Sequence, residues 1–145
     1  MLDREWNRGD RVDLDLPMPI ERVAANPQVK ADQGLLAIQR GPIVYCLEQC
    51  DQTEPLAALW LSQEADLKAA REPGLLDGVV TITGEARATT EPQWRSSLYQ
   101  SAPPAGRAAL KAIPYYAWDN RQPGPMKVWL PASPPVSPAR GLEGP

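Results

Sequence analysis

A chain of 145 residues with a net charge of −3 has room for one β-sandwich or barrel, or for part of a larger assembly. Its Arg and Lys residues are scattered, which argues against nucleic-acid binding, and no apolar run approaches the roughly 18 residues of a membrane helix. The 17 prolines disfavour long helices, and the absence of histidine removes the commonest general base and metal ligand.

The N-terminal residues contain a turn and a pattern typical of a strand. Residues 1–6 lack the apolar centre of a secretory signal, which favours a cytoplasmic location. After the Gly9-Asp10 turn, Arg11–Leu16 alternate strictly between polar and apolar residues. This alternation predicts a strand with Val12, Leu14 and Leu16 facing inward and Asp13 and Asp15 facing outward. Pro17 ends it, and Ile20–Ala24 is predicted to pair beside it as an edge strand.

More β-rich runs follow at short intervals along the chain. Leu35–Arg40 and Ile43–Glu48 are interrupted by Gly41-Pro42, which predicts a bulge or a sharp corner within one path. The remaining predicted strands are Leu56–Leu61, Val79–Thr83, Leu110–Trp118 and Met126–Leu130. Seven or eight short strands favour an all-β fold, an antiparallel and jelly-roll-like β-sandwich.

Three segments differ from this pattern. Ser62–Arg71 has the composition of a helix but is short, so we expect at most one short helix. Thr89–Ala109 is polar and predicted to be a loop, pinned to the sheet by Trp94, Leu98 and Tyr99. Residues 131–145 are rich in Pro, Ser, Ala and Gly, which predicts a disordered tail.

The densest aromatic stretch is predicted to be a hairpin, with Pro123-Gly124-Pro125 as its turn. A strand before the turn would place Tyr116 and Trp118 on one face and Tyr115 on the other; after it, Val128 and Leu130 would lie opposite Trp129. We favour a packing role for these rings over a sugar-binding platform, which would need several exposed, coplanar rings. Just before the turn, Asn120 is expected to bond to nearby backbone, and Arg121 to stack on a ring or pair with a carboxylate.

The two cysteines, Cys46 and Cys50, allow a disulfide, half of a metal site or a nucleophile. A structural zinc needs four ligands, and this chain offers two thiols and no imidazole. Cys46 falls within the predicted strand Ile43–Glu48, where a free buried thiol behaves as a small apolar side chain. We favour that simpler interpretation.

Other candidate groups also lack the partners that catalysis needs. Glu48, Asp51 and Glu54 form an acidic group, which is most simply a solvated loop. Ser96-Ser97 has no histidine with which to build a triad, and Gly34 and Gly41 do not form a phosphate-binding loop. We therefore predict no catalytic, cofactor-binding or metal-binding residue.

Five blocks occur in order: Trp6–Asp10, Leu14–Pro19, Leu36–Glu48, Ile113–Arg121 and Met126–Leu130. Together they resemble the C-terminal region of glycoside hydrolase family 127, the β-L-arabinofuranosidase family. The resemblance implies a β-sandwich region that follows an (α/α)6 barrel. In that family the barrel carries the active site, with a zinc-bound cysteine nucleophile, further cysteine and glutamate ligands and a glutamate acid/base.

None of those catalytic residues can be carried over to this chain, because the family's cysteine cluster lies upstream of every matched block. Cys46 belongs to a sandwich strand and is not equated with the nucleophile, so no zinc or other cofactor is expected here. The resemblance implies that residues 1–30 are end strands of a preceding β-sandwich and that residues 31–130 form the C-terminal one. Residues 131–145 would be the tail.

Three functions remain open from the sequence. The first is a non-catalytic portion of a family 127-like hydrolase that supports the missing barrel or a contact with another copy of the chain. The second is a carbohydrate-binding module that uses exposed Trp and Tyr faces to bind arabinose-containing glycans. The third is the remnant of a truncated gene. In each case we expect the isolated chain to have no glycosidase activity.

Overall fold

The computed structural model describes residues 3–89, 99, 101 and 104–134. This part of the chain contains nine strands and three short 3-10 helices, but no α-helix. The strands are β1 (Ile20–Ala24), β2 (Leu35–Arg40), β3 (Ile43–Glu48), β4 (Leu59–Trp60), β5 (Leu67–Glu72), β6 (Val79–Ala88), β7 (Gly106–Pro114), β8 (Met126–Lys127) and β9 (Trp129–Pro131). The 3-10 helices are η1 (Lys30–Asp32), η2 (Gln49–Asp51) and η3 (Tyr115–Ala117). None of the described helices is long and apolar enough to span a membrane.

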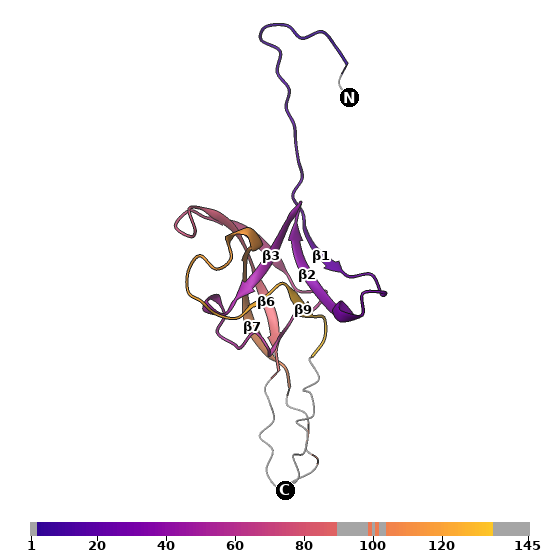
Figure 1. Ribbon diagram of the computed structural model, residues 1–145, viewed down its shortest axis with the longest axis vertical. Coiled ribbons are helices and arrows are strands. Elements are labelled where there is room, and N and C mark those ends of the chain that lie inside the picture. Colours follow the sequence, from indigo (N-terminus) through magenta and orange to yellow (C-terminus); the bar gives the residue numbers. More distant parts are fainter. Residues whose placement is uncertain (1–2, 90–98, 100, 102–103, 135–145) are drawn as a thin grey trace.

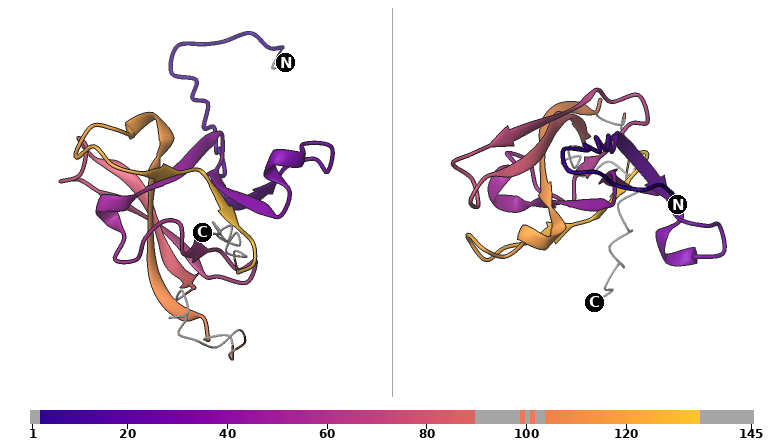
Figure 2. Two further views of the ribbon diagram at one scale, coloured as in Figure 1. Left: turned by 60° about the horizontal axis from the view of Figure 1, so that its bottom comes forward. Right: turned by 90° about the horizontal axis from the view of Figure 1, so that it is seen from above.

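All nine strands belong to one antiparallel sheet that curls strongly on itself (Figures 1 and 2). The main path runs β1-β2-β3-β7-β6-β4, while β5 pairs with β6, β8 with β3 and β9 with β2. The Leu61 N–H donates a 2.8 Å hydrogen bond to the Pro131 carbonyl, which joins the end of β4 to β9. One curled sheet therefore supplies both walls around the core, and the predicted all-β antiparallel fold is confirmed.

The main core fills the inside of the curl. It consists of Ile38, Tyr45, Leu47, Leu56, Leu59, Leu61, Ile82, Ala86, Ala88, Ala108, Leu110, Ala112 and Leu130. A second, smaller cluster contains Cys46, Val79, Ile113 and Ala117. Because neighbouring residues of a strand point to opposite faces, Tyr45 and Leu47 enter the main core while Cys46 enters the second cluster. The end of β3 is thus buried on both faces.

Three predicted strands have the same bounds in the structure, namely β1, β2 and β3. The predicted corner at Gly41-Pro42 is wrong, because β2 and β3 form an antiparallel hairpin in which Arg40 pairs with Ile43. Gly41 adopts a φ of +54°, which lets two residues reverse the chain. β1 pairs along its whole length with β2, and the division of the chain at residue 30 stays a prediction.

The predicted strand Arg11–Leu16 does not form, and the predicted inward face of Val12, Leu14 and Leu16 is exposed. Asp13 and Asp15 are exposed as predicted, but so is every described residue before Met18. The physical reason is that a strand needs a hydrogen-bonded neighbour, and no strand of the described chain pairs with these residues.

The predicted short helix at Ser62–Arg71 is also wrong. Ser62–Ala65 is a turn, in which the Ala65 N–H donates to the Ser62 carbonyl at 3.2 Å, and Leu67 begins β5. β6 offers β5 a continuous antiparallel ladder from Gly84 to Val79. That ladder outweighs the marginal helix propensity of so short a segment.

Three other predictions need correction in the C-terminal half and before β4. Residues 56–58 form a turn, so the predicted strand Leu56–Leu61 shortens to β4. Gly106 already begins β7, inside the predicted loop. The predicted aromatic hairpin does not form, because Tyr115–Ala117 is η3 and β8 pairs with the end of β3. Trp94, Ser96, Ser97 and Leu98 lie outside the described residues, as do residues 135–145 of the predicted tail.

Candidate functional site

The connection between β7 and β8, residues 115–125, is here called the aromatic loop. It begins with η3, in which the Trp118 N–H donates to the Tyr115 carbonyl at 3.1 Å. Asp119 then turns the chain with a φ of +63°, and the Asn120 amide donates to the carbonyls of Ala117 and Trp118 at 3.2 and 3.1 Å. The expected bond of Asn120 to nearby backbone is confirmed, and it stabilises the turn that delivers Arg121 to the sheet.

Arg121 anchors the aromatic loop to the end of β3 and to η2 through two carboxylates. Its Nε lies 3.1 Å from Glu48 Oε2, and its Nη1 lies 2.8 Å from Asp51 Oδ1. Its Nη2 bonds to both carboxylates as well. The other oxygen of Glu48 accepts the Asp119 N–H at 3.1 Å. Pairing of Arg121 with a carboxylate was one of its two expected roles, and it is confirmed.

This cluster is largely withdrawn from water. The side chains of Glu48, Asp51 and Arg121 are only 5%, 10% and 20% exposed. Hydrogen bonds to Asp51 raise the pKa of Arg121; burial opposes that rise, and Glu48 adds to it. The guanidinium therefore stays charged, and its bidentate bonds offset the cost of burying two carboxylates. The prediction that Glu48 lies in a solvated loop is wrong, whereas Glu54 is exposed.

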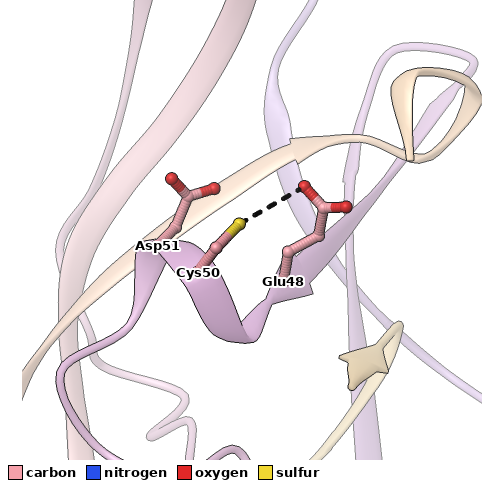
Figure 3. Close-up of side chains that lie close together, drawn as sticks. All are labelled: Glu48, Cys50 and Asp51. Carbon is pink, nitrogen blue, oxygen red and sulfur yellow. Dashed lines mark hydrogen bonds between the residues drawn. The ribbon is translucent and has the colours of Figure 1, made fainter. Parts of the chain in front are cut away.

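Glu48, Cys50 and Asp51 present their side chains to one side of the chain, where β3 continues into η2 (Figure 3). Their possible ligand atoms all lie within 4.8 Å of one another. However, Arg121 and the Asp119 N–H already occupy the carboxylate oxygens of Glu48. Cys50 is exposed, but desolvation by the surrounding protein still raises the pKa of its thiol, which favours the protonated form over the thiolate that metals bind. This donor set fits an ion-paired anchor and does not fit a zinc site.

Cys46 is a fully buried, free thiol on β3. Desolvation and the neighbouring Glu48 carboxylate raise its pKa to about 12. A thiol in that state is a poor nucleophile at neutral pH. Both cysteines are free, so the interpretation of Cys46 as a small apolar side chain is supported and the disulfide is absent.

A shallow groove of about 590 Å³ lies beside the aromatic loop. It is lined by Val44, Tyr115, Met126, Lys127, Val128 and Trp129. Tyr115 and Trp118 stack with their ring centroids 6.0 Å apart and their planes 14° from parallel. The i, i+3 spacing brings them together because side chains three apart eclipse in a 3-10 turn. The predicted pairing of Tyr116 with Trp118 on one strand face is therefore replaced by Tyr115 with Trp118.

Sequence reasoning missed two features of this region. Glu48 and Arg121 were both named, but their contact spans 73 positions and leaves no local signal. The groove was missed because Val44 of β3 and Met126 of β8 line it together only once β8 pairs with β3. The one available signal was the polar end of an otherwise apolar strand, since a carboxylate at Glu48 needs a cation once its strand is buried.

Comparisons with known proteins agree on one family. The model of the glycoside hydrolase family 127 C-terminal domain matches residues 20–131. The non-reducing end β-L-arabinofuranosidase of Bifidobacterium longum subsp. longum is 38% identical over 131 residues, which cover 85% of this chain and 20% of that protein.

Two solved structures extend the likeness to the fold. The GH127 β-L-arabinofuranosidase Ara127N-Se from Geobacillus stearothermophilus T6 is 52% identical with a TM-score of 0.71, over 78% of this chain and 18% of that one. A second GH127 β-arabinofuranosidase is 38% identical with a TM-score of 0.71, over 80% and 17%. The chain thus spans about a fifth of the length of these relatives. It belongs to glycoside hydrolase family 127, and the part it represents is the C-terminal domain.

Proposed function

We propose that this chain is a non-catalytic domain that supports the catalytic barrel of a family 127 glycoside hydrolase by docking against it with the groove and the aromatic loop. The observation that carries this proposal is the match of residues 20–131 to the family's C-terminal domain, within relatives about five times longer. Among the described residues, Arg121 is ion-paired with Glu48 and Asp51, and Lys111 is ion-paired with Glu72. The buried thiol of Cys46 has a raised pKa.

The surface around the groove has the properties of a docking face. Val44 and Tyr115 are partly exposed beside the groove, and Tyr116 is 70% exposed nearby. A contiguous apolar surface of this kind in a folded domain is typical of a protein interface. The bond between Arg121 and Glu48 anchors the aromatic loop to β3, and such an anchor lowers the ordering entropy that a loop loses on docking.

Sugar binding remains the second candidate, because Tyr115, which stacks on Trp118, lines an open groove together with Trp129. A sugar platform needs ring faces that are free and coplanar. Tyr115 and Trp118 stack against each other, so one face of each ring is already covered. Tyr116, the most exposed ring of the loop, has no aromatic partner among the described residues. These contacts favour docking over a sugar platform.

The docking proposal is tested in a chimera in which this chain replaces the matching C-terminal part of the Geobacillus enzyme. Val44→Asp places a carboxylate at the groove, and Val29→Asp is the matched control, because Val29 is similarly exposed, lies on the β1–β2 connection and does not line the groove. We expect Val44→Asp to lower the melting temperature of the chimera more than that of the isolated chain, and Val29→Asp to lower neither. Equal effects of Val44→Asp in both proteins would contradict docking at the groove.

Two assays of the isolated chain address the alternatives. We expect no turnover of an aryl β-L-arabinofuranoside, with or without added zinc. Turnover that follows the protein and disappears in Cys46→Ser would show a catalytic role. We also expect no retention on insoluble arabinan. Retention that is lost in Tyr116→Ala would instead favour the carbohydrate-binding module.

A further inference from the structure

The groove beside the aromatic loop contains one charged side chain, that of Lys127. The other residues that line it are apolar or aromatic, namely Val44, Tyr115, Met126, Val128 and Trp129. Lys127 is partly buried. A lysine in such surroundings places its aliphatic stem against apolar groups and keeps its ammonium in water. Lys127 therefore adds a single positive charge to a groove that is otherwise apolar.

The ammonium of Lys127 has no counter-charge in the described part of the chain. Lys68 pairs with Asp66 at 3.2 Å, and Lys111 pairs with Glu72 at 2.8 Å. Lys127 forms no such ion pair, and no side-chain hydrogen bond, with the residues that the structure describes. Water solvates the ammonium while the groove is open. A surface that closed over the groove would remove this water, and an unpaired charge would then be costly.

The sheet fixes the position from which Lys127 extends. Its backbone pairs with Leu47 in the ladder between β8 and β3. Both of its neighbours in the chain are partly buried and pack against the second cluster of the core. A partner group therefore meets a cation whose backbone is already ordered, which lowers the entropy lost on docking.

We propose that the groove receives a segment in which an apolar side chain lies beside an Asp or Glu carboxylate, from the part of a family 127 enzyme outside this domain. The apolar side chain would fill the groove, and the carboxylate would pair with Lys127. The source of the segment follows from the relatives, because this chain spans only about a fifth of their length. This inference rests on the proposed docking function and adds the chemical character of the partner.

An ion pair at Lys127 would give the docking its specificity. Apolar contacts in a shallow groove accept many side chains of similar size. A charge that must be paired discriminates more sharply, because a partner that lacks the carboxylate leaves the ammonium desolvated and alone. The charge also sets the orientation of the docked segment, since its carboxylate has to lie at the Lys127 end.

A second copy of the chain is a weaker partner for this groove. In a two-fold contact the same patch meets itself, so the lining of one groove would face the lining of the other. The two copies of Lys127 would then approach each other, and none of the lining residues offers a carboxylate. Like charges at an interface oppose association. A segment with its own sequence is free of this constraint.

The first test is acetylation of lysines by acetic anhydride in the Geobacillus chimera and in the isolated chain, followed by mass spectrometry of the peptides. We expect Lys127 to react at least about 10-fold more slowly in the chimera, because a paired carboxylate favours the protonated, unreactive ammonium. Lys30 is the control, since it is exposed on η1 and does not line the groove, and it should react equally in both proteins. Equal rates for Lys127 would overturn the proposal.

Charge variants distinguish a paired carboxylate from simple coverage of the groove. Lys127→Glu should lower the melting temperature of the chimera by at least about 3 °C more than that of the isolated chain, because two carboxylates would then meet. Lys127→Arg keeps the charge and should lower it by less. Lys30→Glu, the control, should affect both proteins alike. Equal losses for Lys127→Glu and Lys127→Arg in the chimera would refute the carboxylate partner.

The outcomes also separate this inference from the docking proposal on which it rests. If Val44→Asp selectively destabilises the chimera and Lys127→Glu does not, the groove docks but its partner is not acidic. If each variant affects the chimera and the isolated chain equally, docking at the groove itself fails.

Two measurements on the isolated chain address other occupants. We expect no retention on polygalacturonate and a monomer in sedimentation. Retention that is lost in Lys127→Met would make an anionic glycan the occupant. A dimer that dissociates in Lys127→Glu would make a second copy the occupant. Either result would overturn the proposal.

Discussion

The aromatic loop and the N-terminal arm (residues 3–17) both expose large apolar side chains, but of these two segments only the loop is tied to the sheet by ion pairs of low exposure. Arg121 of the loop lies between two carboxylates of low exposure, whereas Arg11 of the arm pairs with an Asp13 that is 74% exposed. An exposed pair contributes little because water screens it, and a buried one holds its elements together because an unpaired buried charge is costly. The same residue types therefore anchor one segment to the sheet and lie in exposed pairs in the other.

The largest difference between the two segments is expected when their arginines, Arg121 and Arg11, are replaced separately. Arg121→Met should lower the free energy of unfolding by about 3 kcal/mol or more, because Glu48 and Asp51 would stay buried without a counter-charge. Arg11→Met is the control and should change it by less than about 0.5 kcal/mol. Denaturant titration measures both, and similar losses in the two variants would show that the cluster is not an anchor.

The labelling rates of the two thiols should distinguish the buried end of β3 from the exposed surface of η2. At about pH 8, Cys46 should react with iodoacetamide at least about 100-fold more slowly than the exposed Cys50, because it is buried and its pKa is raised to about 12. Arg121→Met should narrow this difference by loosening the loop, and deletion of the arm should not. Mass spectrometry of the labelled peptides gives the rates. Comparable rates for both thiols in the parent chain would contradict the packing of β3.

Replacing one tryptophan in each segment compares how much packing in the loop and packing in the arm contribute to stability. Trp118→Ala should cost about 1–2 kcal/mol, because the indole, although 38% exposed, stacks on Tyr115. Trp6→Ala should cost less than about 0.5 kcal/mol, since this ring contacts Arg4 on the exposed arm, 4.7 Å from the ring centroid. Thermal or chemical unfolding tests both variants. An equal loss would mean that the arm packs as firmly as the loop.

The smallest expected effect concerns a partly exposed pair between β5 and β7. Lys111 Nζ lies 2.8 Å from Glu72 Oε2, and the Thr81 hydroxyl donates to Glu72 Oε1 at 2.7 Å. These bonds, that of Lys111 first, lower the pKa of Glu72. The resulting stabilisation is present above the unfolded pKa of about 4.5 and is lost as the pH falls through the lower folded value.

Lys111→Met should therefore destabilise the chain by less than about 1 kcal/mol at neutral pH, because water screens a pair exposed by about a third. The difference from the parent should shrink when the pH falls below about 4.5. Denaturant titrations at several pH values measure this, with Arg11→Met as the control for an exposed pair. A difference that grows at low pH would have the wrong sign for this interpretation.

Local patterns in the sequence determined the β-rich class and the bounds of β1, β2 and β3. These strands combine apolar residues with Gly or Pro at their ends, and each finds an antiparallel neighbour close in sequence. The solvated-loop prediction failed at Glu48 because burial there depends on packing from residues some 70 positions away. β5 formed where a helix was predicted because the exposed edge of β6 offered a ladder.

The arm shows the same division between local preference and distant partner. Alternation in Arg11–Leu16 determined which side chains would share a face, but not whether a sheet would receive them. The hairpin of the aromatic stretch failed for a related reason, since β8 pairs with β3 and not with the strand before the turn. A strand's side-chain period is a property of its own backbone, so sequence alone reveals it. Its hydrogen-bonding partner is a separate segment, so only the tertiary structure decides whether and where that strand forms.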